Sequence, residues 1–250
     1  MVLVSPRNPL NIGAAARAMA NFGFHRLTVV APYAPHWREA RSAVGAPDLL
    51  AAAVQSSTLA EAVAKCTLVV GTGTLTHRKP EQKVIALPAL APILIEETNR
   101  GGHVALVFGP EKHGLTREDL SLCQLLVEIP TDPRQPSMNL GQAVAVCLYE
   151  LSSRMFPPTS AFIQAATKPA GNETDEQTLA ARSADLELLA RVVEEAMTAS
   201  DYSPPSMQPA NRHDLRLLLR RLAPNRRDTR RILGLFRRIL WRLNRVPKKN

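Results

Sequence analysis

The sequence is poor in cysteine, and its three cysteines argue against two classes of protein. Cys66, Cys123 and Cys147 form no CxxC pair and no spacing typical of metal ligands, and an odd number cannot all pair in disulfides. Each lies in an apolar run, where cysteine behaves as a small core residue. We therefore expect reduced core thiols, no metal site, and a cytoplasmic rather than a secreted protein.

Long apolar runs are also absent. No uncharged apolar stretch approaches the roughly 18 residues that a membrane-spanning helix needs. Pro88 and Pro92 interrupt the best candidate, residues 84–95. The N-terminus reaches Pro6 before the apolar region of a secretory signal has formed. The sequence predicts a soluble protein without a membrane partner.

The 250-residue chain has a net charge of +9, and the basic excess is confined to its C-terminal part. Residues 212–249 contain 14 of the 31 basic residues but only two of the 22 acidic residues, which leaves 17 basic and 20 acidic residues elsewhere. Positive charge this concentrated is typical of a surface that binds an anionic polymer, above all nucleic acid. A membrane surface or simple solubility are the alternatives that charge alone leaves open.

Apolar strands alternate with helical segments up to residue 156, which predicts an α/β domain with a mainly parallel sheet. The expected strands cover residues 2–4, 27–31, 67–70, 104–108 and 125–129. The expected helices cover residues 11–23, 59–65, 88–99 and a stretch that begins near 139, with weaker helical stretches at 36–44 and 47–54. We divide the chain into this domain (1–156), a polar linker (157–177) and a helical extension (178–250).

The extension is predicted to be helical and basic. One apolar stripe at helical spacing runs from Leu186 to Met197, and two more follow a break at Pro204. We expect the last two helices to be opened by Asn211 and Asn225, to pair with each other, and to expose their arginines.

Two predicted strands stop abruptly, one before Gly109-Pro110 and one before Pro130. We expect them to end side by side, with the loops 109–115 and 130–138 at the carboxyl edge of the sheet. Open α/β sheets bind their ligands at that edge, which makes it the candidate site.

Three motifs carry groups suited to chemistry. In NIGAAAR, Asn11 can cap a helix whose first amides bind an anion, with Arg17 projecting nearby; a capped helix with a surface arginine is the alternative. In FGPEKHGL, glycines permit a tight path and Glu111 can accept hydrogen bonds; an ordinary loop is the alternative. In PSMNLGQAV, Ser137 and Asn139 offer a hydroxyl and an amide, although capping alone would explain Asn139.

Two nucleotide-binding signatures are missing. The run Gly71-Thr72-Gly73 lacks the third glycine of a dinucleotide-binding turn, and there is no Walker A sequence. Neither a Rossmann site nor a P-loop is therefore expected.

NIGAAAR, FGPEKHGL and SMNLGQAV, in this order, resemble the three signature motifs of the SPOUT superfamily of RNA methyltransferases. The resemblance covers about residues 1–156 and is to the TrmH-like branch, which methylates ribose 2'-hydroxyls. It is closest to the bacterial tRNA (cytidine/uridine-2'-O-)-methyltransferases that act at nucleotide 32 of the anticodon loop. An rRNA 2'-O-methyltransferase, or a non-catalytic RNA-binding or ribosome-assembly protein on the same scaffold, are the alternatives.

The resemblance implies a SPOUT α/β fold with a deep trefoil knot, an exception to the rule that chains do not thread themselves. It also implies S-adenosyl-L-methionine as cofactor, a homodimer and a tRNA partner. The functional side chains that it carries over are those of Arg17, Asn11, Glu111, Ser137 and Asn139. The residues that it implies for cofactor binding, chiefly through their backbone, are Thr72, Gly73, Thr74, Gly109, Ile129, Ser137, Met138 and Asn139.

The chain departs from the family pattern at two points. The family runs T-S-A-R after the third strand, whereas Thr72-Gly73-Thr74-Leu75 lacks the arginine; a role of the backbone there survives such a side-chain change. Met138 replaces the usual leucine, a mild change. The family's arginine is often treated as a base, but a guanidinium stays protonated in proteins. We therefore expect Arg17 to grip a phosphate and the developing alkoxide.

Overall fold

The computed structural model describes residues 1–40, 42–73, 80–155 and 179–245. The expected linker, 157–177, and one expected cofactor residue, Thr74, lie outside the described residues. Within the described part, no helix combines the length and apolarity needed to cross a membrane.

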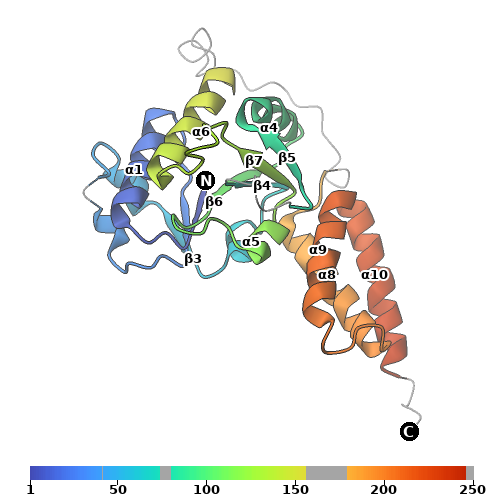
Figure 1. Cartoon of the computed structure of the whole chain (residues 1–250). Coiled ribbons are helices and arrows are strands. Elements are labelled where there is room, and N and C mark those ends of the chain that lie inside the picture. The colour runs from blue at the N-terminus through green and yellow to red at the C-terminus, as the bar shows by residue number, and fades with distance from the viewer. Residues whose placement is uncertain (41, 74–79, 156–178, 246–250) are drawn as a thin grey trace.

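Seven strands form one sheet in which all neighbours are parallel, in the order β3-β2-β1-β6-β4-β7-β5 (Figure 1). The strands are β1 (Val2–Val4), β2 (Thr28–Val30), β3 (Val54–Ser56), β4 (Leu68–Thr72), β5 (Lys83–Ala86), β6 (Val104–Phe108) and β7 (Leu125–Glu128). The five strands expected from the sequence are all present. The two that were missed, β3 and β5, form the edges of the sheet and are largely exposed, so they lack the apolar run that marks a buried strand.

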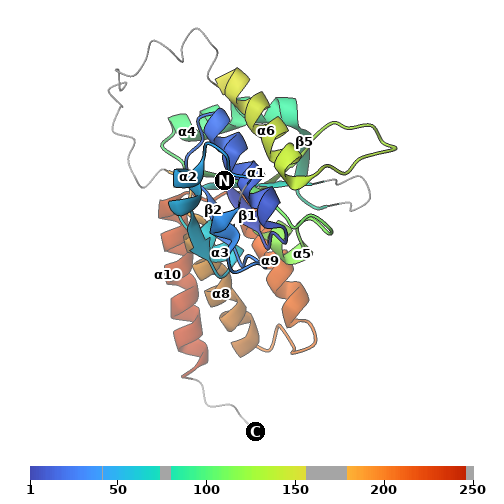
Figure 2. The ribbon, with the colours of Figure 1, turned by 90° about the vertical axis from the view of Figure 1, so that its left-hand side faces the viewer.

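Helices cover both faces of this sheet (Figures 1 and 2). They are α1 (Pro9–Asn21), α2 (Pro47–Ala51), α3 (Leu59–Ala62), α4 (Leu90–Asn99), α5 (Arg117–Ser121), α6 (Leu140–Met155), α8 (Ser183–Ala199), α9 (Gln208–Leu222) and α10 (Arg226–Leu243), with short 3-10 turns at Trp37–Glu39 and Leu87–Ala89. Alternate residues of a strand enter different cores: Leu106 and Phe108 pack with α1, α4 and α6, whereas Ala105 and Val107 pack with α3 and α5.

The two strands that lead to the candidate site, β6 and β7, were expected to lie side by side. They do not, because β4 lies between them and pairs with both. The prediction of a shared edge is nevertheless correct, since parallel strands end at the same side of the sheet. The loops that follow β1, β4, β6 and β7 therefore meet at one edge.

Helix α1 begins two residues earlier than expected. Asn8, rather than Asn11, is its N-cap, and the Asn8 side chain accepts a hydrogen bond from the Leu10 amide at 2.9 Å. Pro9 explains the shift, because proline suits the first position of a helix, where no N–H partner is needed. The Asn11 side chain is thereby left available for another partner.

The C-terminal extension forms a three-helix unit, but its helices pair differently from the prediction. Helices α9 and α10 each make their largest contact with α8 (Figure 2). The reason is that α8 buries seven residues, whereas α9 buries two and α10 one. Asn225 caps α10 as expected, whereas α9 starts at Gln208, so that Asn211 lies within its first turn.

The extension is attached to the α3 and α5 side of the sheet. The Ser183 amide donates to the Cys66 carbonyl at 2.8 Å, and Arg216 of α9 approaches Glu118 of α5 to 3.7 Å. The three cysteines are free thiols. Burial raises the pKa of both Cys123 and Cys147 to about 12, which keeps these two thiols protonated and unreactive.

Candidate active site

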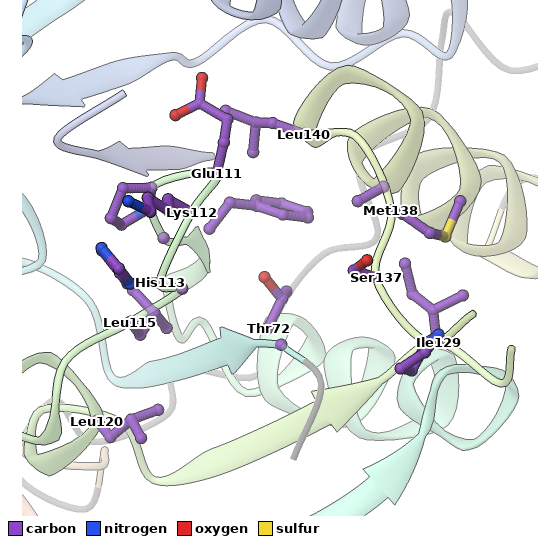
Figure 3. Close-up of a pocket in the computed structure, with 17 residues that line it drawn as sticks. Thr72, Glu111, Lys112, His113, Leu115, Leu120, Ile129, Ser137, Met138 and Leu140 are labelled. Atoms are coloured by element: carbon purple, nitrogen blue, oxygen red, sulfur yellow. The ribbon is translucent and has the colours of Figure 1, made fainter. Parts of the chain in front are cut away.

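A cavity of about 240 Å³ opens at the carboxyl ends of β4, β6 and β7 (Figure 3). Thr72 and Gly73 at the end of β4 contribute one wall. The loop after β6 (109–115) contributes a second wall, and Ile129 with the segment 136–138 before α6 contributes a third. The sequence expectation of a pocket at this edge is correct.

The loop after β6 follows a path that requires glycine. A Cβ at Gly109 would lie 2.3 Å from the Leu115 amide nitrogen, and Gly114 has a φ of +63°, a conformation that L side chains rarely adopt. The Gly114 amide closes the turn by donating to the Pro110 carbonyl at 2.8 Å. The loop can therefore fold back tightly beside the cavity and present its backbone to it.

A chain of side-chain hydrogen bonds joins all three motifs. The Asn139 amide group donates to Asn11 Oδ1 at 2.9 Å, and Asn11 Nδ2 donates to Glu111 Oε1 at 2.8 Å. Glu111 also accepts from the main-chain amides of Arg7 and Asn8, at 3.1 and 3.3 Å. Asn139 Oδ1 in turn accepts from the Gly141 amide at 2.9 Å, which caps α6.

The carboxylate sets the orientation of both amides in this chain. An ionised carboxylate can only accept hydrogen bonds, so Asn11 must turn its NH₂ group toward Glu111 and its oxygen toward Asn139. Asn139 must then donate with its NH₂ group, which leaves its oxygen for the first turn of α6. These hydrogen bonds therefore fix the orientation of the Asn11 and Asn139 amide groups.

Two opposing effects act on the pKa of Glu111. Partial burial raises this pKa, but hydrogen bonds from Asn11 and from the main chain at Glu111, Arg7 and Asn8 together lower it more. The net pKa lies below its ordinary value of 4.5, so Glu111 is ionised at neutral pH.

The structure brings most of the predicted site residues together. Those that line the cavity are Thr72, Gly73, Gly109, Glu111, Ile129, Ser137 and Met138. Asn11 and Asn139 do not line it, but they are hydrogen-bonded to each other beside Glu111. Arg17 is the exception, because it is exposed on α1 and does not line the cavity.

Arg17 lies instead on an exposed surface formed by α1 and α6. These helices pack tightly, because Gly141 lets α6 approach Ala14; a Cβ at Gly141 would lie 2.7 Å from the Ala14 Cβ. The exposed side of the pair also carries Leu10 (54% exposed), Val146 (37%) and Tyr149 (61%), and we call these three residues with Arg17 the α1–α6 face.

Sequence reasoning missed the apolar walls of the cavity and its neighbour. Phe108, Leu115, Leu120 and Leu140 line the cavity, but in the sequence they are indistinguishable from core residues. A second cavity of about 570 Å³ shares Leu115 and Leu120 with the first and is bordered by His213 and Leu217 of α9. The extension therefore reaches the rim of the site, which no local sequence signal reveals.

An all-parallel α/β sheet with a pocket at the ends of β4, β6 and β7, three motifs joined by hydrogen bonds beside it, and a helical extension define an RNA methyltransferase of the SPOUT type. The model of the SpoU rRNA Methylase family matches residues 1–149. The chain belongs to this family, and both the resemblance and the fold class expected from the sequence are confirmed.

Three known proteins show how far the similarity extends. A tRNA (cytidine/uridine/adenosine-2'-O-)-methyltransferase TrmJ of Pseudomonas aeruginosa is 42% identical over 71% of this chain and 66% of its own length. A tRNA (cytidine/uridine-2'-O-)-methyltransferase TrmJ of Cronobacter sakazakii is 32% identical over 99% of this chain and 98% of its own. The crystal structure of TrmJ from Z. mobilis ZM4 superposes with a TM-score of 0.79 at 30% identity, covering 95% of this chain and 97% of that one.

The hydrogen bonds to Glu111 predict a pH-dependent contribution to stability. A carboxyl group whose pKa is lowered by folding stabilises the folded state above its ordinary pKa of 4.5, and this effect is lost as the pH falls through the folded pKa. Glu111→Gln should lower the melting temperature by about 2–4 °C at neutral pH. The difference from wild type should shrink in thermal scans taken at progressively lower pH below 4.5.

Glu195→Gln is the matched control, because Glu195 is exposed on α8 and no hydrogen bond of its side chain is found within the described residues. Its melting curve should follow the wild type at every pH. A constant difference between wild type and Glu111→Gln across this range would contradict the assigned role of the carboxylate.

Proposed function

We propose that this protein transfers a methyl group from S-adenosyl-L-methionine to a ribose 2'-hydroxyl of tRNA, at the cytidine or uridine of position 32 in the anticodon loop. The observation that carries the proposal is the convergence of the chain segments after β4, β6 and β7 on one cavity, beside which the Asn139–Asn11–Glu111 hydrogen bonds join the three motifs. The TrmJ relatives, one of them similar over nearly the whole chain, support tRNA as the substrate. A cytoplasmic location is part of the proposal.

The lining of the cavity fits S-adenosyl-L-methionine. Apolar side chains such as Phe108, Leu115 and Leu120 suit an adenine ring, and backbone groups at the ends of β4, β6 and β7 suit its polar edge. Thr72, Gly73, Gly109, Ile129 and the segment 137–139 would hold the cofactor, and Thr74 belongs to the same proposal. The bound cofactor supplies an electrophilic methyl group on a sulfonium sulfur.

The remaining task of the protein is to orient the hydroxyl and to stabilise the oxygen as negative charge develops on it. We assign that task to Arg17, whose charged guanidinium can contact both a phosphate and the alkoxide. Ser137 is placed to orient the substrate, since it lines the cavity and no hydrogen bond of its hydroxyl is found within the described residues. Glu111, Asn11 and Asn139 hold the loops in position.

Arg17 can act in this way only if a second copy of the chain is present. It does not line its own cavity, and it lies on the α1–α6 face among exposed apolar side chains. We propose that two copies associate through this face, which buries Leu10, Val146 and Tyr149 and brings each Arg17 to the site of its partner. The homodimer is thus a requirement of the chemistry.

The extension completes the proposed substrate-binding surface. Residues 178–250 carry the basic excess, and α9 borders the cavity next to the site. Contacts to phosphates there supply affinity and orientation rather than sequence reading. The division into a catalytic domain (1–156), a linker (157–177) and an RNA-binding extension is part of the proposal.

The reaction can be tested at the level of a single atom. Methyl-labelled S-adenosyl-L-methionine should label an unmodified tRNA transcript with cytidine or uridine at position 32. The same tRNA carrying 2'-deoxycytidine at that position should accept no label, because the nucleophile is missing. Labelling of the deoxy substrate, or of purified rRNA in preference to tRNA, would contradict the assignment.

The partner role of Arg17 can be tested with mixed dimers. Arg17→Ala and Gly109→Ala chains, co-expressed with different tags and purified as the heterodimer, combine one intact cavity with one intact Arg17 across the interface. This heterodimer should methylate at about half the wild-type rate per dimer, since one of the two sites is complete. Both parent homodimers should be nearly inactive in single-turnover assays.

Three controls make this result decisive. Calorimetry should show that Gly109→Ala loses cofactor binding while Arg17→Ala keeps it, and sedimentation should show dimers throughout. Arg17→Lys should restore little activity if planar, bidentate contacts matter. An inactive heterodimer of normal size would place Arg17 in its own site, whereas an active Arg17→Ala homodimer would place it outside catalysis.

A further inference from the structure

The arginines of the extension divide into two groups with different surroundings. Three of the four arginines of α9 are paired with acids: Arg212 with Glu194 at 2.7 Å, and both Arg216 and Arg220 with Glu187 at 2.9 Å, while Arg221 is exposed. Arg220 is only 4% exposed. The three paired guanidinium groups are therefore engaged in holding α9 against α8.

Helix α10 is different. Six of its arginines are exposed, and within residues 179–245 none of the six has an acidic partner within ion-pair distance: Arg227, Arg230, Arg231, Arg237, Arg238 and Arg242. The α10 residues that pack against α8 are apolar ones such as Ile232 and Phe236. The arginine side of α10 thus faces solvent, at the outer edge of the three-helix unit (Figures 1 and 2).

A glycine lies at the centre of this arginine surface. Three glycines occur inside the described helices, and the fold explains two of them: a Cβ would lie 2.2 Å from Ser42 Oγ at Gly13 and 2.7 Å from Ala14 Cβ at Gly141. Gly234 in α10 has no neighbour within 4 Å of a Cβ and no positive φ. Glycine in an exposed helix interior is destabilising, so the folded chain alone gives no reason for it.

The helical repeat places four of these six arginines around Gly234. Arg230, Arg231, Arg237 and Arg238 are three or four residues away on either side, so they are its neighbours on the helix surface. One turn further on, the Trp241 ring contacts the guanidinium groups of Arg238 and Arg245 at 4.0 and 3.9 Å, which holds both on this side. The helix backbone at Gly234 is therefore exposed between four arginines that have no acidic partner within residues 179–245.

We propose that this surface of α10, centred on Gly234, is a docking site for the phosphate backbone of RNA. The missing side chain lets the backbone of the nucleic acid approach the helix closely, while the surrounding guanidinium groups bind its phosphates from both sides. The proposal rests on the tRNA methylation proposed above, and it assigns the contact to α10 rather than to the paired arginines of α9.

The packing of α10 favours RNA over a membrane surface. A helix that binds lipid must insert an apolar face between the headgroups. The apolar residues Ile232, Leu233 and Phe236 of α10 pack in the core with α8, which leaves only part of its apolar surface, at Leu235, Ile239 and Trp241, exposed among the described residues. Its arginine side can bind phosphates only from outside, as a nucleic-acid backbone requires.

Substitutions at Gly234 separate stability from binding, because they change the two in opposite directions. Gly234→Ala should raise the melting temperature of the full-length protein by about 2–4 °C, yet weaken tRNA binding about threefold. Gly234→Leu should weaken tRNA binding about tenfold, as expected for the loss of one charged contact. Ala210→Leu, at an exposed position of α9, is the matched control and should leave tRNA binding unchanged.

Salt dependence identifies which arginines contact phosphate. Arg231→Gln should reduce the slope of log Kd against log salt concentration by about one, since one counterion-releasing contact is lost. Arg212→Gln, which removes an arginine paired with Glu194, should leave the slope unchanged. Equal slopes for these two variants would overturn the assignment to α10.

Further outcomes keep this inference separate from the proposed function. Wild-type tRNA methylation combined with unchanged tRNA affinity in Gly234→Leu would refute the docking site while leaving the enzyme assignment intact. Binding of the wild type, but not of Gly234→Leu, to vesicles of phosphatidylglycerol and phosphatidylcholine would also refute it, in favour of a membrane surface. Absence of tRNA methylation by the wild type would instead refute the proposed function.

Discussion

The carboxylate of Glu111 is the point on which the geometry of the site depends. It accepts hydrogen bonds from Arg7, Asn8 and Asn11, about one hundred residues away in the chain, and through Asn11 it orients Asn139. Because a carboxylate has only acceptors, it leaves each amide a single useful orientation. Charge-assisted bonds of this kind are also stronger than neutral ones, so one side chain fixes three segments that the sheet merely brings near.

The sheet makes this contact possible. Strands β1 and β6 are neighbours and parallel, so the segment after β1, with Arg7 and Asn8, leaves the sheet beside the loop that carries Glu111. Helix α1 then starts at Pro9, and α6 is placed against it by the contact of Gly141 with Ala14. The same bonds that order the cavity therefore also set the pair of helices that carries Arg17. The proposed dimer contact and the proposed cofactor pocket therefore both depend on the hydrogen bonds among Glu111, Asn11 and Asn139.

Local sequence signals predicted the parts of this arrangement that depend on buried strands and on glycine. The central strands were found because they are continuous apolar runs, and the tight loop was found because Gly109 and Gly114 permit a path that other residues would not. The edge strand β3 was missed because exposed edge strands carry no such run. Asn11 was expected to cap α1, but capping is a competition between neighbours, and Asn8 followed by Pro9 is the better start. The partners of Asn11 were beyond local reasoning, since they depend on strand order.

The basic extension shows why net charge alone does not locate a binding surface. Half-buried Arg216 and buried Arg220 share one carboxylate, Glu187, so these two guanidinium groups are engaged within the molecule and are not available to bind RNA. Removing a partner from such a pair is costly, whereas the isolated cations of α10 contribute little to folding. Arginines without acids around them weaken a compact helix bundle by mutual repulsion. That repulsion is relieved when an anion binds, so the side of the bundle least favourable for folding is the side best suited to a polyanion.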